Sequence, residues 1–270
     1  GNAPESLALS LLPLILWAFR RLVLTGHWGW FLASVGSLAT LYLTHNISSL
    51  LFTPFLVAYL CVLWWTHRRR AHWALTLVAL ALALGLTAFF LAPALLEKGY
   101  VHLDASRSNR NNDFHYNFVG LAEILAPPKP VDTSLLNPPV LIQLGLVPAI
   151  LAVAGLIAGL MRQHNLERRA MLVLFALAAT GMVGMSTAAS IWVWETLPLI
   201  SFVQFPWRFI GRAALPVALL AGAAFSGPPT CKPDLWSRRS WLSTGLVLAA
   251  SCGLILAAFP TTYPIRGFSQ

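Results

Sequence analysis

Two arginines in the last third of the chain have the spacing of a phosphate-binding pair. Arg208 and Arg212 lie four residues apart and directly follow Pro206 and Trp207, at the start of an apolar stretch. Proline is well placed to begin a helix, and side chains at i and i+4 of a helix share one face. Two guanidinium groups beside a helix N-terminus can bind phosphate or pyrophosphate. The alternative is that both arginines extend to lipid headgroups without a specific ligand.

Two further positions are candidates for catalysis. Glu5 follows Pro4 at the start of the first apolar stretch, where a carboxylate complements the helix dipole or binds a metal or a sugar hydroxyl. His45 and Asn46 form a short connection between two apolar stretches. Asn is an ordinary turn residue, whereas the imidazole could bind phosphate, metal or substrate. Glu5 and His45 are therefore the catalytic candidates, and Asn46 is a candidate for the substrate cavity.

Polar side chains in the longer loops supply the remaining candidates. Each of them is either a solvated loop residue or a residue that lines a substrate cavity. Asp113 and His115 are too few ligands to define a metal site, so no metal site is predicted and a divalent metal as cofactor is left open. The sequence contains no P-loop, GxGxxG, GxSxG or HExxH motif. The cavity candidates in this group are Glu97, Tyr100, Arg107, Arg110, Asp113, His115, Gln204 and Trp207.

The composition excludes a soluble globular protein. Of 270 residues, 57% are hydrophobic and only 10% are charged, and the mean hydropathy is +0.70. Soluble domains carry about 25% charged residues. The sequence therefore predicts an all-α, polytopic membrane protein that forms a single transmembrane helical domain over residues 1–270.

A helix that crosses a membrane needs about 20 predominantly apolar residues. Eight stretches approach this length, although the first is short. We expect about eight spans at Leu7–Phe19, Trp28–Thr44, Ile47–Trp65, Trp73–Leu96, Pro139–Met161, Ala170–Ser186, Trp207–Ser226 and Trp241–Phe259.

The positive charge is concentrated on alternate loops. Eleven of the 18 Lys and Arg residues lie in the loops at 20–27, 66–72, 162–169 and 227–240. The positive-inside rule places these loops in the cytoplasm, so both ends of the chain are expected outside it, in a bacterial inner membrane. Since the net charge of +9 is explained by this asymmetry, no nucleic-acid partner is predicted.

The opposite face carries the longer connections. Residues 97–138 form a long extracytoplasmic loop, and residues 187–206 are expected to form an interfacial segment that holds Trp192 and Trp194. No charged residue falls in the middle of a span, which argues against ion-coupled transport. Small-residue pairs at Gly155 and Gly159 and at Gly181 and Gly184 are typical of helix-packing faces.

Four segments together resemble a known family. They are Gly1–Glu5, Leu43–Asn46, Phe90–Glu97 and Gln204–Phe209. The set resembles bacterial multi-pass proteins of the GT-C glycosyltransferase superfamily, and within it the subgroup named 6-pyruvoyl-tetrahydropterin synthase-related. That name implies no pterin chemistry here, because no residue of this sequence supports it.

The resemblance implies a GT-C-like fold and transfer of a sugar from a polyprenyl-phosphate donor outside the cytoplasm. Glu5 matches the acidic position that opens this span, His45 and Asn46 match the outer hairpin, and Arg208 matches a Pro-Trp-Arg motif. Arg208 and Arg212 would neutralise the leaving phosphate. The catalytic Asp or Glu of such enzymes usually lies in the first outer loop, close to the N-terminus. This chain is expected to start after that loop and therefore to be a fragment that lacks the N-terminal part.

Two alternatives remain from other functional classes. The first is a transporter or flippase for lipid-linked glycans, which would need a polar groove through the bilayer. The second is a non-catalytic membrane scaffold that has kept phosphate affinity without turnover. The bilayer is the expected partner in all three cases, and the lipid-linked sugar is the expected partner of the enzyme.

Overall fold

The computed structural model describes residues 3–68, 71–97, 100, 110–127, 142–197 and 200–225, and three single positions at 245, 249 and 252. Every regular element within these residues is a helix. The long helices are α1 (Ala3–Thr25), α2 (Trp28–Thr44), α3 (Asn46–Thr66), α4 (Trp73–Leu96), α7 (Leu146–Arg162), α8 (Leu166–Met185) and α10 (Arg208–Ala223). The short ones are η2 (Arg110–Asn112), η3 (Phe114–Tyr116), α6 (Leu121–Ile124), η4 (Ala188–Ser190), α9 (Ile191–Thr196) and η5 (Ile200–Val203).

Four helices of the described residues are long enough and apolar enough to cross a membrane. Among the described residues, α1, α3, α4 and α8 meet the requirement for length and apolar composition. Helices α2 and α7 have 17 residues and α10 has 16. The stretch predicted at 241–259 lies almost entirely outside the described residues. The structure therefore contains four candidate spans within the described residues, and the predicted count of about eight is not confirmed.

Two predicted boundaries differ because of local backbone chemistry. The first helix begins at Ala3 rather than Leu7, because proline is tolerated in a first helical turn and Glu5 complements the dipole there. The helix predicted from Pro139 begins only at Leu146. Gly145, which precedes it, has φ +86°, which is not a helical conformation, so no helix can continue through this residue into α7.

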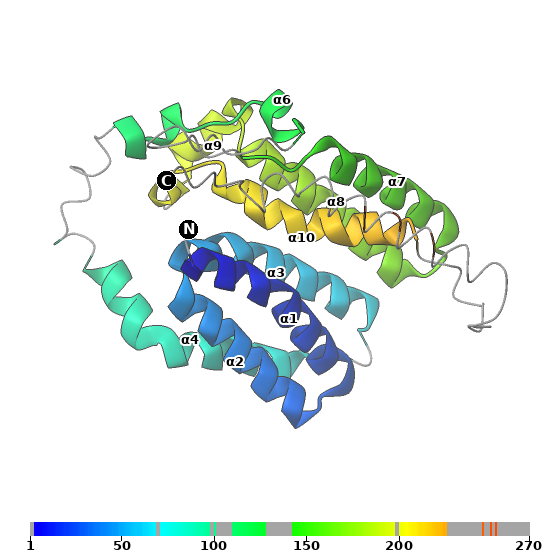
Figure 1. Cartoon of the computed structure of the whole chain (residues 1–270). Coiled ribbons are helices and arrows are strands. Elements are labelled where there is room, and N and C mark those ends of the chain that lie inside the picture. The colour runs from blue at the N-terminus through cyan, green and yellow to red at the C-terminus, as the bar shows by residue number, and fades with distance from the viewer. Residues whose placement is uncertain are drawn as a thin grey trace, which may run out of the picture.

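The long helices form two groups that pack on each other (Figure 1). In the first group, α1 packs on α2, α3 and α4, and it buries Leu12, Ile15 and Phe19 on one face. In the second group, α10 packs on both α7 and α8. Contacts of α8 with α3 and of α10 with α1 join the groups. One end of this junction holds the candidate site.

Three of the four loops that were predicted to share one side meet at one end of the bundle, and the fourth, at 227–240, lies outside the described residues. Arg20 Nη2 lies 2.5 Å from Glu167 Oε1, and His67 Nε2 lies 3.4 Å from Glu167 Oε2. These residues come from three of the four basic loops. Glu5 lies 15 residues before Arg20 on α1, which separates the two ends by about 22 Å of helix. The three described basic loops therefore lie at the end of the bundle opposite to Glu5.

The segment predicted to lie in the membrane interface is only partly exposed. It contains η4, α9 and η5. Trp192 is 65% exposed, but Trp194 is 1% exposed and its Nε1 donates to the carbonyl of Met185 at 3.0 Å. Trp194 therefore belongs to the protein core rather than to a surface that faces the lipid.

Candidate functional site

Three helices begin at the same end of the bundle and bring together side chains from distant parts of the chain. Helix α1 contributes Glu5 from its first turn, α3 contributes Ser48, and α10 contributes Arg208 and Arg212. The four-residue spacing places both arginines on one face of α10, as the sequence predicts.

Arg212 is the centre of this cluster and is only 1% exposed. Its Nη1 donates to Glu5 Oε1 at 2.5 Å and to the carbonyl of Arg208 at 2.6 Å. Its Nη2 donates to Ser48 Oγ at 2.5 Å. A buried charge needs a counter-charge and hydrogen bonds to offset its lost hydration, and these three groups supply them. Arg212 thus ties α10 to α1 and α3.

His45 extends the cluster at the start of α3. The backbone N–H of Ser48 donates to His45 Nδ1 at 3.0 Å, and Ser48 Oγ lies 2.9 Å from the same nitrogen. This is a helix N-cap made by an imidazole. Burial lowers the pKa of His45; the negative charge of Glu5 opposes this, and Arg212 and Arg208 add to the lowering. A neutral imidazole with its proton on Nε2 fits these contacts.

Arg208 lies beside this network and is half-buried. Its Nη1 donates to the carbonyl of Val203 at 3.1 Å. Its guanidinium carbon lies 4.9 Å from the ring centroid of Phe205 and 5.9 Å from that of Trp207, so two aromatic rings hold it by cation–π contacts. Gln204, in the turn before them, has φ +62°, which is uncommon for a residue other than glycine.

A cavity of about 960 Å³ opens beside these arginines. Its polar lining comes from Glu5, Ser6, Gln143, Arg208 and Arg212. Its apolar lining continues along α10 as far as Ala221. Thirteen residues of α-helix separate Arg208 from Ala221, so the cavity wall extends for about 20 Å from the charged end.

Three buried polar atoms in this lining have no hydrogen-bond partner among the described residues. They are Gln143 Oε1, Arg208 Nε and Arg212 Nε. An unpaired buried donor or acceptor costs about 1–3 kcal/mol. A bound polar ligand or ordered water would offset part of this cost.

The other predicted residues are distributed more widely. Trp207 lines the cavity, whereas Gln204 does not. Asn46 is exposed as the first residue of α3, so His45 alone connects α2 and α3. Glu97 is the exposed C-cap of α4, and Tyr100 is 87% exposed.

The polar loop after α4 forms a cluster of its own. Arg107 lies outside the described residues, and the guanidinium carbon of Arg110 lies 4.8 Å from the Tyr116 ring centroid. His115 Nδ1 lies 2.6 Å from Asp113 Oδ1, and its Nε2 lies 3.4 Å from Glu195 Oε1. The hydrogen bond to Asp113 raises the pKa of His115, partial burial opposes this, and the bond to Glu195 adds to the rise.

Contacts between aromatic rings join this cluster to α10. The ring centroid of Phe114 lies 5.4 Å from that of Trp194, which lies 5.9 Å from that of Phe209. None of Arg110, Asp113 and His115 lines the cavity at Arg208. Among the described residues, no group of three or more His, Cys, Asp or Glu side chains could hold a metal ion.

Sequence reasoning missed two residues of the site. Ser48 lies one turn into α3, and its sequence signal is only its place three residues after His45. Gln143 precedes α7 and carries no local signal, because its role depends on the cavity that α10 forms.

A family model described as "6-pyruvoyl-tetrahydropterin synthase related domain; membrane protein" matches residues 1–259. The chain belongs to this family of membrane proteins. No curated protein and no solved structure matches the chain. The matched residues include Glu5, Ser48, Arg208 and Arg212, and therefore the whole cluster at the start of α10. As a membrane protein, the chain contacts the lipid bilayer through exposed apolar side chains such as Phe89, which is 74% exposed.

Proposed function

We propose that the chain is part of a GT-C-type membrane glycosyltransferase and that the cavity at the start of α10 receives a polyprenyl-phosphate-linked sugar. The observation that carries the proposal is the shape and polarity of this cavity. Its charged end contains Arg208, and its wall continues as an apolar surface along α10 to Ala221. A lipid-linked sugar phosphate has the same division into an anionic head and a long hydrocarbon.

The charges at the polar end favour an anion. Arg208 and Arg212 carry two positive charges and Glu5, which is directly bonded to Arg212, carries one negative charge, so the cluster keeps one net positive charge. Val203 provides only a neutral carbonyl to Arg208. A guanidinium can contact two oxygens of one phosphate, and its charge would stabilise the phosphate that leaves during sugar transfer.

The acceptor hydroxyl must lose a proton during the transfer, which requires a general base. Glu5 and His45 are the candidates in this chain. The carboxylate of Glu5 already accepts a hydrogen bond from the buried guanidinium of Arg212. The Nδ1 of His45 already accepts the backbone N–H of Ser48, and its Nε2 then carries the proton, so neither nitrogen is free to take a proton from an acceptor. We therefore place the acidic side chain that acts as the general base elsewhere in the protein. We assign Glu5 a positioning role through Arg212.

A transporter for lipid-linked glycans is the second candidate, although the wall of this cavity beyond Arg212 is apolar and does not form the polar groove that a transporter would need. The two functions differ in what happens to the bound lipid. An enzyme releases polyprenyl phosphate and a glycosylated acceptor, whereas a transporter moves intact lipid-linked sugar between leaflets.

The experiment compares Arg208→Ala with Arg169→Ala in protein reconstituted into nanodiscs. Arg169 is an exposed arginine near the start of α8 and does not line the cavity. We expect Arg208→Ala to weaken polyprenyl-phosphate binding by about 10- to 100-fold, which corresponds to the loss of one charged hydrogen bond. Arg169→Ala removes the same charge and should bind normally.

Equal affinities of the two variants would contradict the donor site. Binding that depends on Arg208, with sugar transfer to no acceptor but movement of labelled lipid-linked sugar between leaflets, would favour the transporter. Binding that depends on Arg208 without either activity would favour a scaffold.

A further inference from the structure

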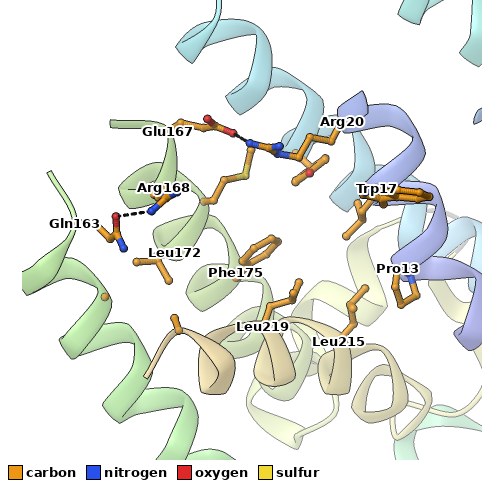
Figure 2. Close-up of a pocket in the computed structure, with 15 residues that line it drawn as sticks. Pro13, Trp17, Arg20, Gln163, Glu167, Arg168, Leu172, Phe175, Leu215 and Leu219 are labelled. Carbon is orange, nitrogen blue, oxygen red and sulfur yellow. Dashed lines mark hydrogen bonds and ion pairs between the residues drawn. The ribbon is translucent and has the colours of Figure 1, made fainter. Parts of the chain in front are cut away.

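A second cavity, of about 600 Å³, lies between α1, α8 and α10 and reaches the opposite end of the bundle from Glu5. Figure 2 shows its polar side chains, among them Arg20, Glu167 and Arg168, grouped along one side, with Phe175, Leu215 and Leu219 on the other. It is thus divided into a charged part and an apolar part.

The charged part has an excess of positive charge. Arg20 and Glu167 neutralise each other in their 2.5 Å ion pair. Arg168 Nη1 donates to Gln163 Oε1 at 3.2 Å, and this partner is neutral. In the described part of the chain, no carboxylate lies within salt-bridge distance of Arg168. The charge of Arg168 therefore remains for a ligand.

The apolar part extends into the hydrophobic region of the bundle and is open at the surface. Helix α1 lines it from Arg20 back to Pro13, and α8 lines it from Arg168 to Phe175. Each of these segments covers about 10 Å of helix. The lining residues Trp17 and Leu219 are 52% and 41% exposed, so hydrocarbon of the bilayer has access to the cavity.

We propose that this cavity binds one anionic phospholipid from the leaflet at this end of the bundle. The phosphate would lie at Arg168, beside Arg20, and one acyl chain would lie along Phe175, Leu215 and Leu219. A free anion would leave the apolar walls uncovered, and a zwitterionic lipid would leave the positive charge uncompensated. Basic pockets between membrane helices bind anionic headgroups in this manner. The proposal does not depend on the sugar-transfer function.

The test measures lipid binding to the purified full chain by native mass spectrometry, with phosphatidylglycerol and phosphatidylethanolamine as probes. The variants are Arg168→Gln and Arg169→Gln, which remove the same charge from adjacent positions of α8. Arg169 is exposed and does not line the cavity. We expect Arg168→Gln to weaken phosphatidylglycerol binding by about fivefold, the contribution of one basic residue. Arg169→Gln should retain the affinity of the unmodified chain.

A third variant, Ala223→Phe, fills the cavity and keeps both arginines. It should exclude phosphatidylglycerol while its thermal unfolding remains cooperative. Equal affinity for the two lipids, or equal effects of the two glutamine substitutions, would overturn the proposal. It would also be overturned if the chain were a dimer that Ala223→Phe dissociates, because a second copy of the chain would then occupy the cavity. Arg208→Ala should leave phosphatidylglycerol binding intact, so the two cavities are tested separately.

Discussion

At the residue scale, Arg212 combines a structural and a functional position. It is buried, and it is hydrogen-bonded to residues of two other helices. Removing one partner of a buried ion pair leaves an uncompensated charge, which is far more costly than removing both. The stability of this end of the bundle should therefore depend on the pair and not on either residue alone.

Glu5→Gln tests this dependence, because the amide keeps the size of the side chain and removes its charge. We expect the variant to lose about 3–5 kcal/mol of unfolding free energy, as found for buried pairs that lose one partner. The measurement is denaturant unfolding in detergent micelles, followed by tryptophan fluorescence.

The double substitution Glu5→Leu with Arg212→Met provides the control. Two apolar side chains leave no charge behind, so this protein should be closer in stability to the unmodified chain than Glu5→Gln is. If the double variant is as unstable as the single one, or if Glu5→Gln loses less than about 1 kcal/mol, the pair is not a determinant of stability.

The sequence predicts only part of this site, and the reason is the distance between its members along the chain. The spacing of Arg208 and Arg212 is local, so helical periodicity predicts their common face. The partners Glu5 and Ser48 lie 207 and 164 residues away from Arg212. No periodic pattern relates separate helices, so these contacts follow only from the packing of α1, α3 and α10.

At the element scale, two pairs of closely spaced glycines, four residues apart in α7 and three apart in α8, have different surroundings. A Cβ added to Gly155 would lie 1.9 Å from the carbonyl oxygen of Leu220, and one added to Gly159 would lie 2.6 Å from Leu172 Cδ1. No described atom lies within 4 Å of such a Cβ at Gly181 or Gly184. The predicted packing role is therefore confirmed in α7 but not for α8 within the described residues.

Gly155→Ala should separate α7 from α10, because the contact is with rigid backbone. We expect a loss of about 1–3 kcal/mol in unfolding free energy, the usual cost of overpacking. Gly181→Ala is the matched control and should gain up to about 1 kcal/mol from the higher helix propensity of alanine. Thermal unfolding in micelles measures both. A stability of Gly155→Ala equal to that of Gly181→Ala would show that α7 and α10 do not approach closely.

At the scale of the whole molecule, the two ends of the bundle differ in charge and in structure. One end holds basic loops that contact one another through Arg20, His67 and Glu167. The other holds the cluster around Arg212 and the loop with His115. The alternation of loops is readable from the sequence, because charge and hydropathy determine it locally. The packing of α8 on α3 is not, since it depends on the shapes of the helices.

Cysteine labelling determines which end faces the cytoplasm. Asn111 and His164 are exposed positions at opposite ends, and each is replaced by Cys in a chain whose native Cys61, Cys231 and Cys252 are changed to Ser. The positive-inside rule predicts that an impermeant thiol reagent labels position 111 in intact cells and position 164 only after lysis. The reverse pattern would show that the topology is inverted. The anionic-lipid site would then lie in the outer leaflet.

The ion pair between Glu5 and Arg212 also has a consequence for biosynthesis. Its two residues are separated by 207 positions, and a ribosome adds about 5–20 residues per second. The carboxylate at the start of α1 must therefore wait about 10–40 s for its partner. During that time, water at the membrane surface must hydrate the carboxylate of Glu5. The arrival of α10 thus completes an insertion process that α1 began, and the nascent bundle is most vulnerable to misassembly and proteolysis before that moment.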